Sequence, residues 1–110
     1  MIGTRSILDS RCREDGVRIC VMRFVRNFYD YDEWMRDLAP SIRLLDDYRE
    51  RRIGWDEFAE RYLKEMGEKK ELIHELRRRS EGGEVITLLC WERDARFCHR
   101  SLLKRLIDEA

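Results

Sequence analysis

The side chains best suited to chemistry gather near the C-terminus. Cys90 and Glu92 follow a strongly apolar run, and Cys98, His99 and Arg100 come after a short polar segment. The second group opens a predicted helix, where free N–H groups and a partial positive charge favour anions and lower the pKa of a thiol. This pattern favours nucleophilic chemistry by a Cys98 thiolate, with Glu92 or His99 transferring protons.

Two arginines, Arg23 and Arg26, stand at or just past the end of another apolar segment. A guanidinium binds a phosphate or carboxylate through paired N–H groups. Together with Arg100 and Cys90, these residues predict a ligand-binding pocket for an anionic small molecule, phosphorylated or nucleotide-like. The alternative is that these arginines form ion pairs with Asp30 or Asp32.

Each of these residues also has a structural interpretation. Cys90 ends an apolar run, which is typical of a buried core residue. Cys98 could pack as a small apolar side chain beneath the loop. His99 could only hydrogen-bond across that loop, and Glu92 could pair with a neighbouring arginine.

Cys90, Cys98 and His99 are candidate metal ligands, because thiolates and imidazole bind zinc well. The spacing Cys-x7-Cys-His is not a recognised zinc pattern. Adjacent residues on a helix also point about 100° apart, which disfavours one ion shared by Cys98 and His99. The sequence therefore predicts no metal and no cofactor.

A strand, a Cys-x5-Arg loop and a helix is the layout of a cysteine phosphatase, and Cys90 and Arg96 have that spacing. The intervening loop has no glycine to let its N–H groups converge on a phosphate, and it contains Glu92 and Asp94. Because both carboxylates would repel a phosphate, we interpret the spacing as a coincidence.

Three apolar segments are predicted to be the strands that position these groups: residues 2–8, 17–25 and 84–90. The last has a continuous apolar run, which is typical of a central strand covered on both faces. Arg18 and Arg23 indicate that the second is not wholly buried. Because ligands bind outside the carboxyl ends of parallel strands, the predicted site lies where these strands end.

Five segments between and after the strands have helical signals: a short helix from Asp32 through Leu38, then residues 42–52, 55–66, 69–80 and 98–108. The clearest is 55–66, whose apolar residues recur at helical spacing. Strands interleaved with helices predict an α/β fold. We expect one domain over residues 1–110, a small layer sandwich of about three mainly parallel strands flanked by four to five helices.

The composition limits the partners. The 110 residues carry 23 basic and 23 acidic side chains, so the formal net charge is zero, which excludes a simple polybasic nucleic-acid binder. Arginine clusters at residues 49–52 and 77–79 keep nucleic-acid association open, although acidic neighbours within helical reach would neutralise them. No apolar run approaches the ~18 residues of a membrane span, so we expect a cytoplasmic protein with no membrane partner.

The segments Leu88-Leu89-Cys90-Trp91-Glu92 and Cys98-His99-Arg100-Ser101 resemble the closing signature of the domain of unknown function 488 family. Three further segments are similar to elements of that family: Val21-Met22-Arg23 with Arg26, Trp34 with Leu38-Ala39-Pro40-Ser41, and Trp55 to Tyr62. The resemblance implies an α/β fold and no established activity.

The first functional hypothesis is therefore a small cytoplasmic protein that binds or acts on an anionic small molecule at the strand ends. The second is a non-catalytic interaction module with the same pocket. The third is association with nucleic acid through the arginine clusters.

Overall fold

A four-stranded parallel sheet forms the centre of the computed structural model, which describes the backbone of residues 1–110 and every side chain except that of Ala95. The strands are β1 (Ile2–Ser6), β2 (Val17–Cys20), β3 (Glu33–Trp34) and β4 (Ile86–Cys90). They lie in the order β1-β4-β2-β3, and every neighbouring pair is parallel. The predicted α/β class with a parallel sheet is confirmed.

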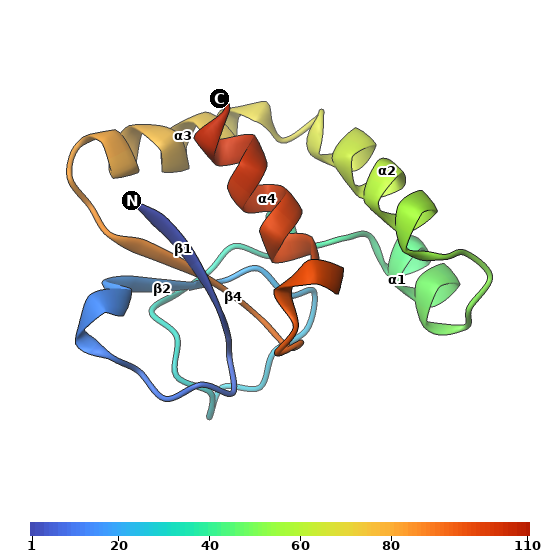
Figure 1. Ribbon diagram of the computed structural model, residues 1–110, viewed down its shortest axis with the longest axis horizontal. Helices are drawn as coiled ribbons and strands as arrows, with labels where there is room; N and C mark the ends of the chain where they lie inside the picture. Colours follow the sequence, from blue (N-terminus) through green and yellow to red (C-terminus); the bar gives the residue numbers. More distant parts are fainter.

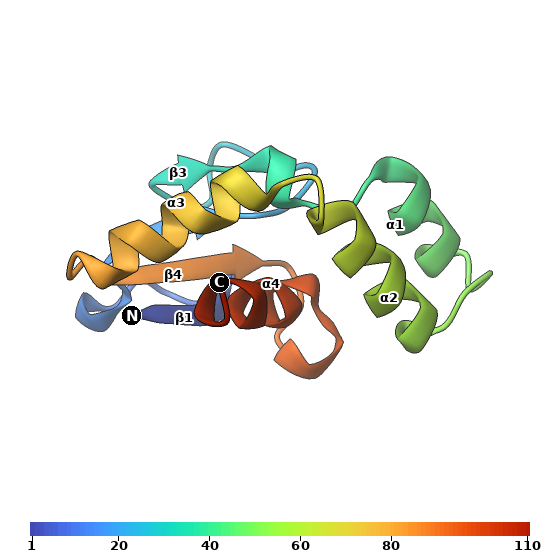
Figure 2. The ribbon, with the colours of Figure 1, turned by 90° about the horizontal axis from the view of Figure 1, so that it is seen from above.

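The helices are α1 (Ile42–Arg49), α2 (Trp55–Met66), α3 (Lys70–Glu81) and α4 (His99–Asp108). Three short 3-10 turns are η1 (Arg13–Asp15), η2 (Arg36–Leu38) and η3 (Ala95–Phe97). Figures 1 and 2 show α3 and α4 covering one face of the sheet, whereas α1 and α2 lie beyond the carboxyl end of β4. Within the described part of the chain, no helix combines the length and the apolarity that crossing a bilayer requires.

Strand β4 is internal to the sheet, as its apolar sequence predicts, and all its residues are buried. Alternate residues face opposite sides of a strand. Leu88 therefore packs with Leu76 of α3 and Leu103 of α4, while Leu89 packs with Cys20 beneath the segment that follows β2. This burial fixes the end of β4, and with it the position of Cys90.

The second strand is shorter than the predicted segment 17–25. The Val21 N–H still donates to the Leu89 carbonyl at 3.0 Å, but β4 ends one residue later and offers no further partner. The chain then leaves the sheet. Arg23 and Arg26 consequently lie in the loop beyond β2 rather than on the strand itself.

The predicted helix from Asp32 through Leu38 is wrong. Strand β3 and turn η2 occupy this segment instead. The reason is the Asp32 carboxylate, which accepts the Arg18 N–H at 2.8 Å, while the Asp32 N–H donates to the Arg18 carbonyl at 2.8 Å. These bonds attach the segment to β2, so the carboxylate does not cap a helix.

Arg18 is fully buried, contrary to the prediction that it exposes the second strand. Its guanidinium donates to the Asp15 carboxylate at 2.8 Å and to the carbonyls of Asp9 and Asp30. Burial alone would raise the pKa of Asp15, but the Cys12 N–H and thiol, Arg18 and Arg5 together hold it well below its ordinary value. A buried arginine is acceptable here because its donors are satisfied.

Candidate functional site

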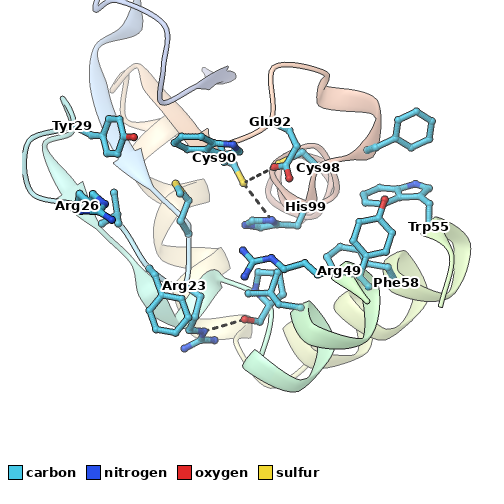
Figure 3. Close-up of a pocket in the computed structure, with 18 residues that line it drawn as sticks. Arg23, Arg26, Tyr29, Arg49, Trp55, Phe58, Cys90, Glu92, Cys98 and His99 are labelled. Atoms are coloured by element: carbon cyan, nitrogen blue, oxygen red, sulfur yellow. Dashed lines mark hydrogen bonds between the residues drawn. The ribbon is translucent and has the colours of Figure 1, made fainter. Parts of the chain in front are cut away.

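A cavity of about 620 Å³ opens at the carboxyl ends of β2 and β4. Residues of α1, the start of α2, the loop after β2 and the segment between β4 and α4 line it. Six of the seven predicted site residues line this cavity, and Arg100 does not. Figure 3 shows Cys90, Cys98 and His99 grouped at one part of the wall, with Glu92 beside Cys90.

Three arginines line the cavity: Arg23, Arg26 and Arg49. Among the side chains that the structure describes, none of the three has an acidic partner within ion-pair distance. The acidic residues considered as partners from the sequence, Asp30 and Asp32, bind Arg11 instead. Arg26 and Arg49 are exposed, so their charge is available to a ligand.

Arg23 is half-buried and is held by the backbone. Its Nε donates to the Pro40 carbonyl at 3.0 Å, and a terminal nitrogen donates to the Ala39 carbonyl at 3.2 Å. A guanidinium has five N–H donors, so this anchoring leaves others available. Arg23 therefore supplies a positioned charge at the wall of the cavity.

Arg49 is a cavity residue that the sequence interpretation missed, because it was grouped with the surface cluster at residues 49–52. It lies four residues after Leu45, which also lines the cavity, and positions four apart share a helix face. This four-residue spacing is the sequence signal that places Arg49 on the same helix face as Leu45. In Figure 3 the Arg49 side chain extends from the end of α1 into the cavity.

Aromatic rings form most of the remaining wall: Phe24, Tyr29, Tyr48, Trp55, Phe58, Trp91 and Phe97. The rings of Trp55 and Phe58 stack with their centroids 5.2 Å apart, and Phe97 meets Trp55 edge-on at 5.8 Å. The helical spacing of Trp55 and Phe58 predicts core residues, and Phe58 is indeed buried. Both also border the cavity, which periodicity alone does not reveal.

Cys98 is the N-cap residue of α4 and is buried, as is Cys90 at the end of β4. The Cys90 thiol lowers the pKa of Cys98, and His99 and the Arg100 N–H lower it further, although burial opposes them. The same contact with Cys98, together with burial, raises the pKa of Cys90. The pair therefore favours a thiolate on Cys98 and a protonated thiol on Cys90.

His99 is buried, and both of its ring nitrogens face a neighbour. Nε2 lies 2.7 Å from the Val21 carbonyl oxygen, and Nδ1 lies 3.6 Å from the Cys90 sulfur. A carbonyl only accepts hydrogen bonds, so Nε2 is protonated and donates to Val21. Nδ1 faces the cysteines.

Glu92 and Arg100 have different surroundings. The Glu92 carboxylate is exposed to the cavity and accepts the Cys90 thiol at 3.5 Å. Arg100 is 1 % exposed, and its guanidinium donates to the carbonyls of Glu92 and Arg93. Arg100 thus holds the backbone that carries Glu92, and its guanidinium lies outside the cavity wall.

Cys90, Cys98 and His99 place their ligand atoms within 4.8 Å of one another. The expectation that Cys98 and His99 diverge by a helical step is wrong. Cys98 precedes the helix and has extended backbone angles, φ −134° and ψ 139°, so the rotation between adjacent helical residues does not apply to it. The structure therefore brings together three side chains able to bind a metal.

Three arginines of the surface clusters, Arg52, Arg77 and Arg79, are paired with carboxylates of the chain. Arg79 pairs with Glu33 and Glu84, and Arg77 pairs with Glu81. These guanidiniums already have carboxylate partners, so they offer less free charge to a nucleic-acid phosphate than their sequence suggests.

Comparison with known proteins identifies relatives of the chain. The family described as "Active DUF488-N3 subclade" matches residues 2–110. Uncharacterized protein Rv3073c of Mycobacterium tuberculosis (strain ATCC 25618 / H37Rv) is 31% identical over 100 residues, which cover 86% of this chain and 83% of that protein. Uncharacterized protein Mb3100c of Mycobacterium bovis has the same identity and coverage. No solved structure matches the chain. The chain therefore belongs to the DUF488 family, within its active DUF488-N3 subclade.

Proposed function

We propose that the cavity binds an anionic small molecule that also carries a planar ring, phosphorylated or nucleotide-like, and that the cysteine–histidine cluster acts on it. One observation carries the proposal: three arginines without carboxylate partners share an aromatic cavity with Cys90, Cys98 and His99. The volume of about 620 Å³ is that of an ordinary small-molecule site, for which roughly 300–1,000 Å³ is usual.

The arginines support recognition of the anionic group. Figure 3 shows Arg23 and Arg26 on the side of the cavity opposite Trp55 and Phe58. A phosphate or carboxylate bound there would receive paired N–H donors from Arg26, with Arg23 already oriented by the Ala39 and Pro40 carbonyls. Arg49 would reach the same molecule from α1.

The aromatic wall supports recognition of a ring. Trp55 is half-buried, so part of its ring surface remains open to the cavity, and the stacked Phe58 supports it from beneath. Aromatic faces stack on planar rings whatever the ring's own substituents. The cavity has arginines on one side and aromatic rings on the other. A molecule with an anionic group at one end and a planar ring at the other therefore fits it better than a simple inorganic anion does.

The cluster beside the cavity supplies the reactive groups. In the catalytic form of the proposal, the Cys98 thiolate is the nucleophile, and Glu92 exchanges protons with the bound molecule because its carboxylate is exposed to the cavity. The hydrogen bond to the Val21 carbonyl holds the His99 ring beside the cysteines. A cytoplasmic location, with its reducing conditions, would keep the cysteines reduced.

Calorimetric titration with adenosine 5′-monophosphate and with neutral adenosine tests this proposal. We expect the monophosphate to bind more tightly, because only it engages the arginines. Arg26→Ala and Arg49→Ala should each weaken monophosphate binding about 10-fold or more, since a hydrogen bond to a charged group contributes roughly 1.5–3 kcal/mol.

Arg78→Ala is the matched control, because Arg78 is an exposed arginine on α3 and does not line the cavity. The proposal fails if the monophosphate and adenosine bind equally, or if Arg26→Ala and Arg49→Ala bind the monophosphate as Arg78→Ala does. Normal binding by Cys98→Ser with no turnover in any variant would instead indicate a binding module without catalysis.

A further inference from the structure

We propose that Cys90, Cys98 and His99 form a binding site for a thiophilic divalent metal ion, of which Zn²⁺ is the representative, with one coordination position open to the cavity. The two sulfur atoms and a histidine ring nitrogen lie within 4.8 Å of one another, and all three side chains are buried. The site goes beyond the proposed function, since metal binding does not depend on which molecule enters the cavity.

The histidine is held as a metal-binding histidine usually is. Its Nε2–H donates to the Val21 carbonyl at 2.7 Å, which leaves Nδ1 as the ring nitrogen directed toward the cluster, 3.6 Å from the Cys90 sulfur. Metal-bound histidines almost always donate their second ring N–H to a carbonyl or carboxylate, which fixes the tautomer and the ring orientation. The ring also packs against the buried Tyr62, with centroids 5.3 Å apart.

The three ligands come from rigid parts of the fold. Cys90 is the last residue of the central strand β4, while Cys98 and His99 cap and begin α4. Their exposed fractions are 4 %, 2 % and 6 %. Because strand and helix hold the donors close together before any ion arrives, binding requires little rearrangement.

The donor set determines which ions fit. Two thiolates and one imidazole favour soft or borderline cations such as Zn²⁺, whereas Mg²⁺ and Ca²⁺ prefer oxygen ligands. Zinc sites with three protein ligands keep a fourth position for water or substrate, and two cysteines with one histidine are a known set. All three donors border the cavity, so the fourth position faces it.

Glu92 lies at the same edge of the cluster, 3.5 Å from the Cys90 sulfur. If water filled the open position, Glu92 would be the nearby carboxylate able to accept its proton. If the proposed function holds, an oxygen of the bound anionic molecule could take the open position instead. With metal bound, the Cys98 sulfur is a ligand, so direct attack by its thiolate belongs only to the metal-free protein.

Titration of the reduced, metal-free chain with Co²⁺ tests the site. We expect about one equivalent to produce thiolate-to-cobalt charge-transfer absorption and the strong visible bands of tetrahedral Co²⁺, and Zn²⁺ to displace it. Cys98→Ser and His99→Gln should each lower the Co²⁺ affinity at least about 100-fold. This loss exceeds the one expected when a mutation removes only a residue that hydrogen-bonds to a metal ligand. Cys12→Ser removes a thiol outside the cluster and should bind like the unmodified chain.

X-ray absorption of the Zn²⁺-loaded unmodified chain gives a measurement that does not depend on the folding of any variant. We expect two sulfur neighbours at about 2.3 Å and one nitrogen neighbour at about 2.0–2.1 Å. A shell without sulfur, or a cobalt–thiolate band that survives in Cys98→Ser but disappears in Cys12→Ser, would overturn the site.

Separate experiments test the metal site and the proposed function, so either proposal can be refuted without the other. Metal uptake is measured without nucleotide, and monophosphate binding is measured in the metal-free chain. Sulfur ligation of Zn²⁺ with no monophosphate binding would retain the metal site and remove the proposed function. Monophosphate binding with no sulfur ligation would do the reverse.

Discussion

Asp15→Asn tests the buried ion pair that secures the start of β2. Asp15 accepts hydrogen bonds from Arg5, the Cys12 N–H and Arg18 at 2.8 to 3.1 Å, and it is 3 % exposed. The substitution preserves shape but leaves the Arg18 guanidinium, which has no exposed surface, with only carbonyl partners.

The expected loss of stability is large. At 2.8 Å, a Coulomb attraction of about 6 kcal/mol follows from an effective dielectric constant of about 20, before desolvation is subtracted. Removing one partner of a buried pair costs about 3–5 kcal/mol, a large share of the roughly 5–15 kcal/mol that stabilises a domain. Urea unfolding at neutral pH, followed by circular dichroism, measures the difference. Asp30→Asn, which affects the exposed pair with Arg11, should change stability little.

The pH dependence gives a second check on Asp15→Asn. The pKa of Asp15 is lowered in the folded protein, so its contribution is full above the unfolded value of about 3.9 and is lost as the pH falls toward the folded value. The stability gap between the unmodified chain and Asp15→Asn should therefore narrow in acid. A gap below about 1 kcal/mol at neutral pH, or one that does not change with pH, would refute the reasoning.

Two further substitutions test the packing of the core and of the turn before β2. Tyr62→Phe removes the buried hydroxyl that donates to the Leu38 carbonyl at 2.7 Å. Urea titration should show an unfolding free energy lower by roughly 1–3 kcal/mol. An unchanged unfolding free energy would contradict a buried hydrogen bond at this position. Gly16→Ala places a Cβ 2.2 Å from the Val85 carbonyl oxygen at a residue with φ +62°, so the midpoint temperature of thermal unfolding should fall by several degrees. Gly54→Ala is the control, because open space surrounds Gly54, and it should leave the midpoint unchanged. Equal shifts in the two glycine variants would count against this conformation.

The sequence predicted the parts of the fold that depend on long apolar patterns. The apolar run ending at Cys90 required a central strand, and the stripe from Trp55 onward required helix α2, which together fixed where the cavity lies. Strand β3 was not predicted, because it is only two residues long and has too short a pattern to recognise. Hydrogen bonds between Asp32 and Arg18, which the sequence does not reveal, hold it to β2.

The residues of the candidate site were predictable as a set, but the geometry among them was not. Strand and helix ends indicated that Cys90 and Cys98 would approach each other. The contact of His99 with both the cysteines and Val21 depends on the extended backbone of Cys98, which no spacing rule includes. The sequence predicts that Arg100 contacts the ligand. In the folded chain its guanidinium instead donates hydrogen bonds to the Glu92 and Arg93 carbonyls, which sequence patterns do not reveal.

The most direct test of the central claim is the NMR response of the tryptophan indole N–H groups to adenosine 5′-monophosphate. Trp55 and Trp91 line the cavity, whereas the Trp34 indole lies outside it and donates to the Met22 carbonyl at 2.8 Å. If the cavity binds an anionic molecule with a ring, the Trp55 and Trp91 signals shift and saturate while the Trp34 signal stays in place. Three unmoved signals, or a Trp34 shift as large as the other two, would contradict the account.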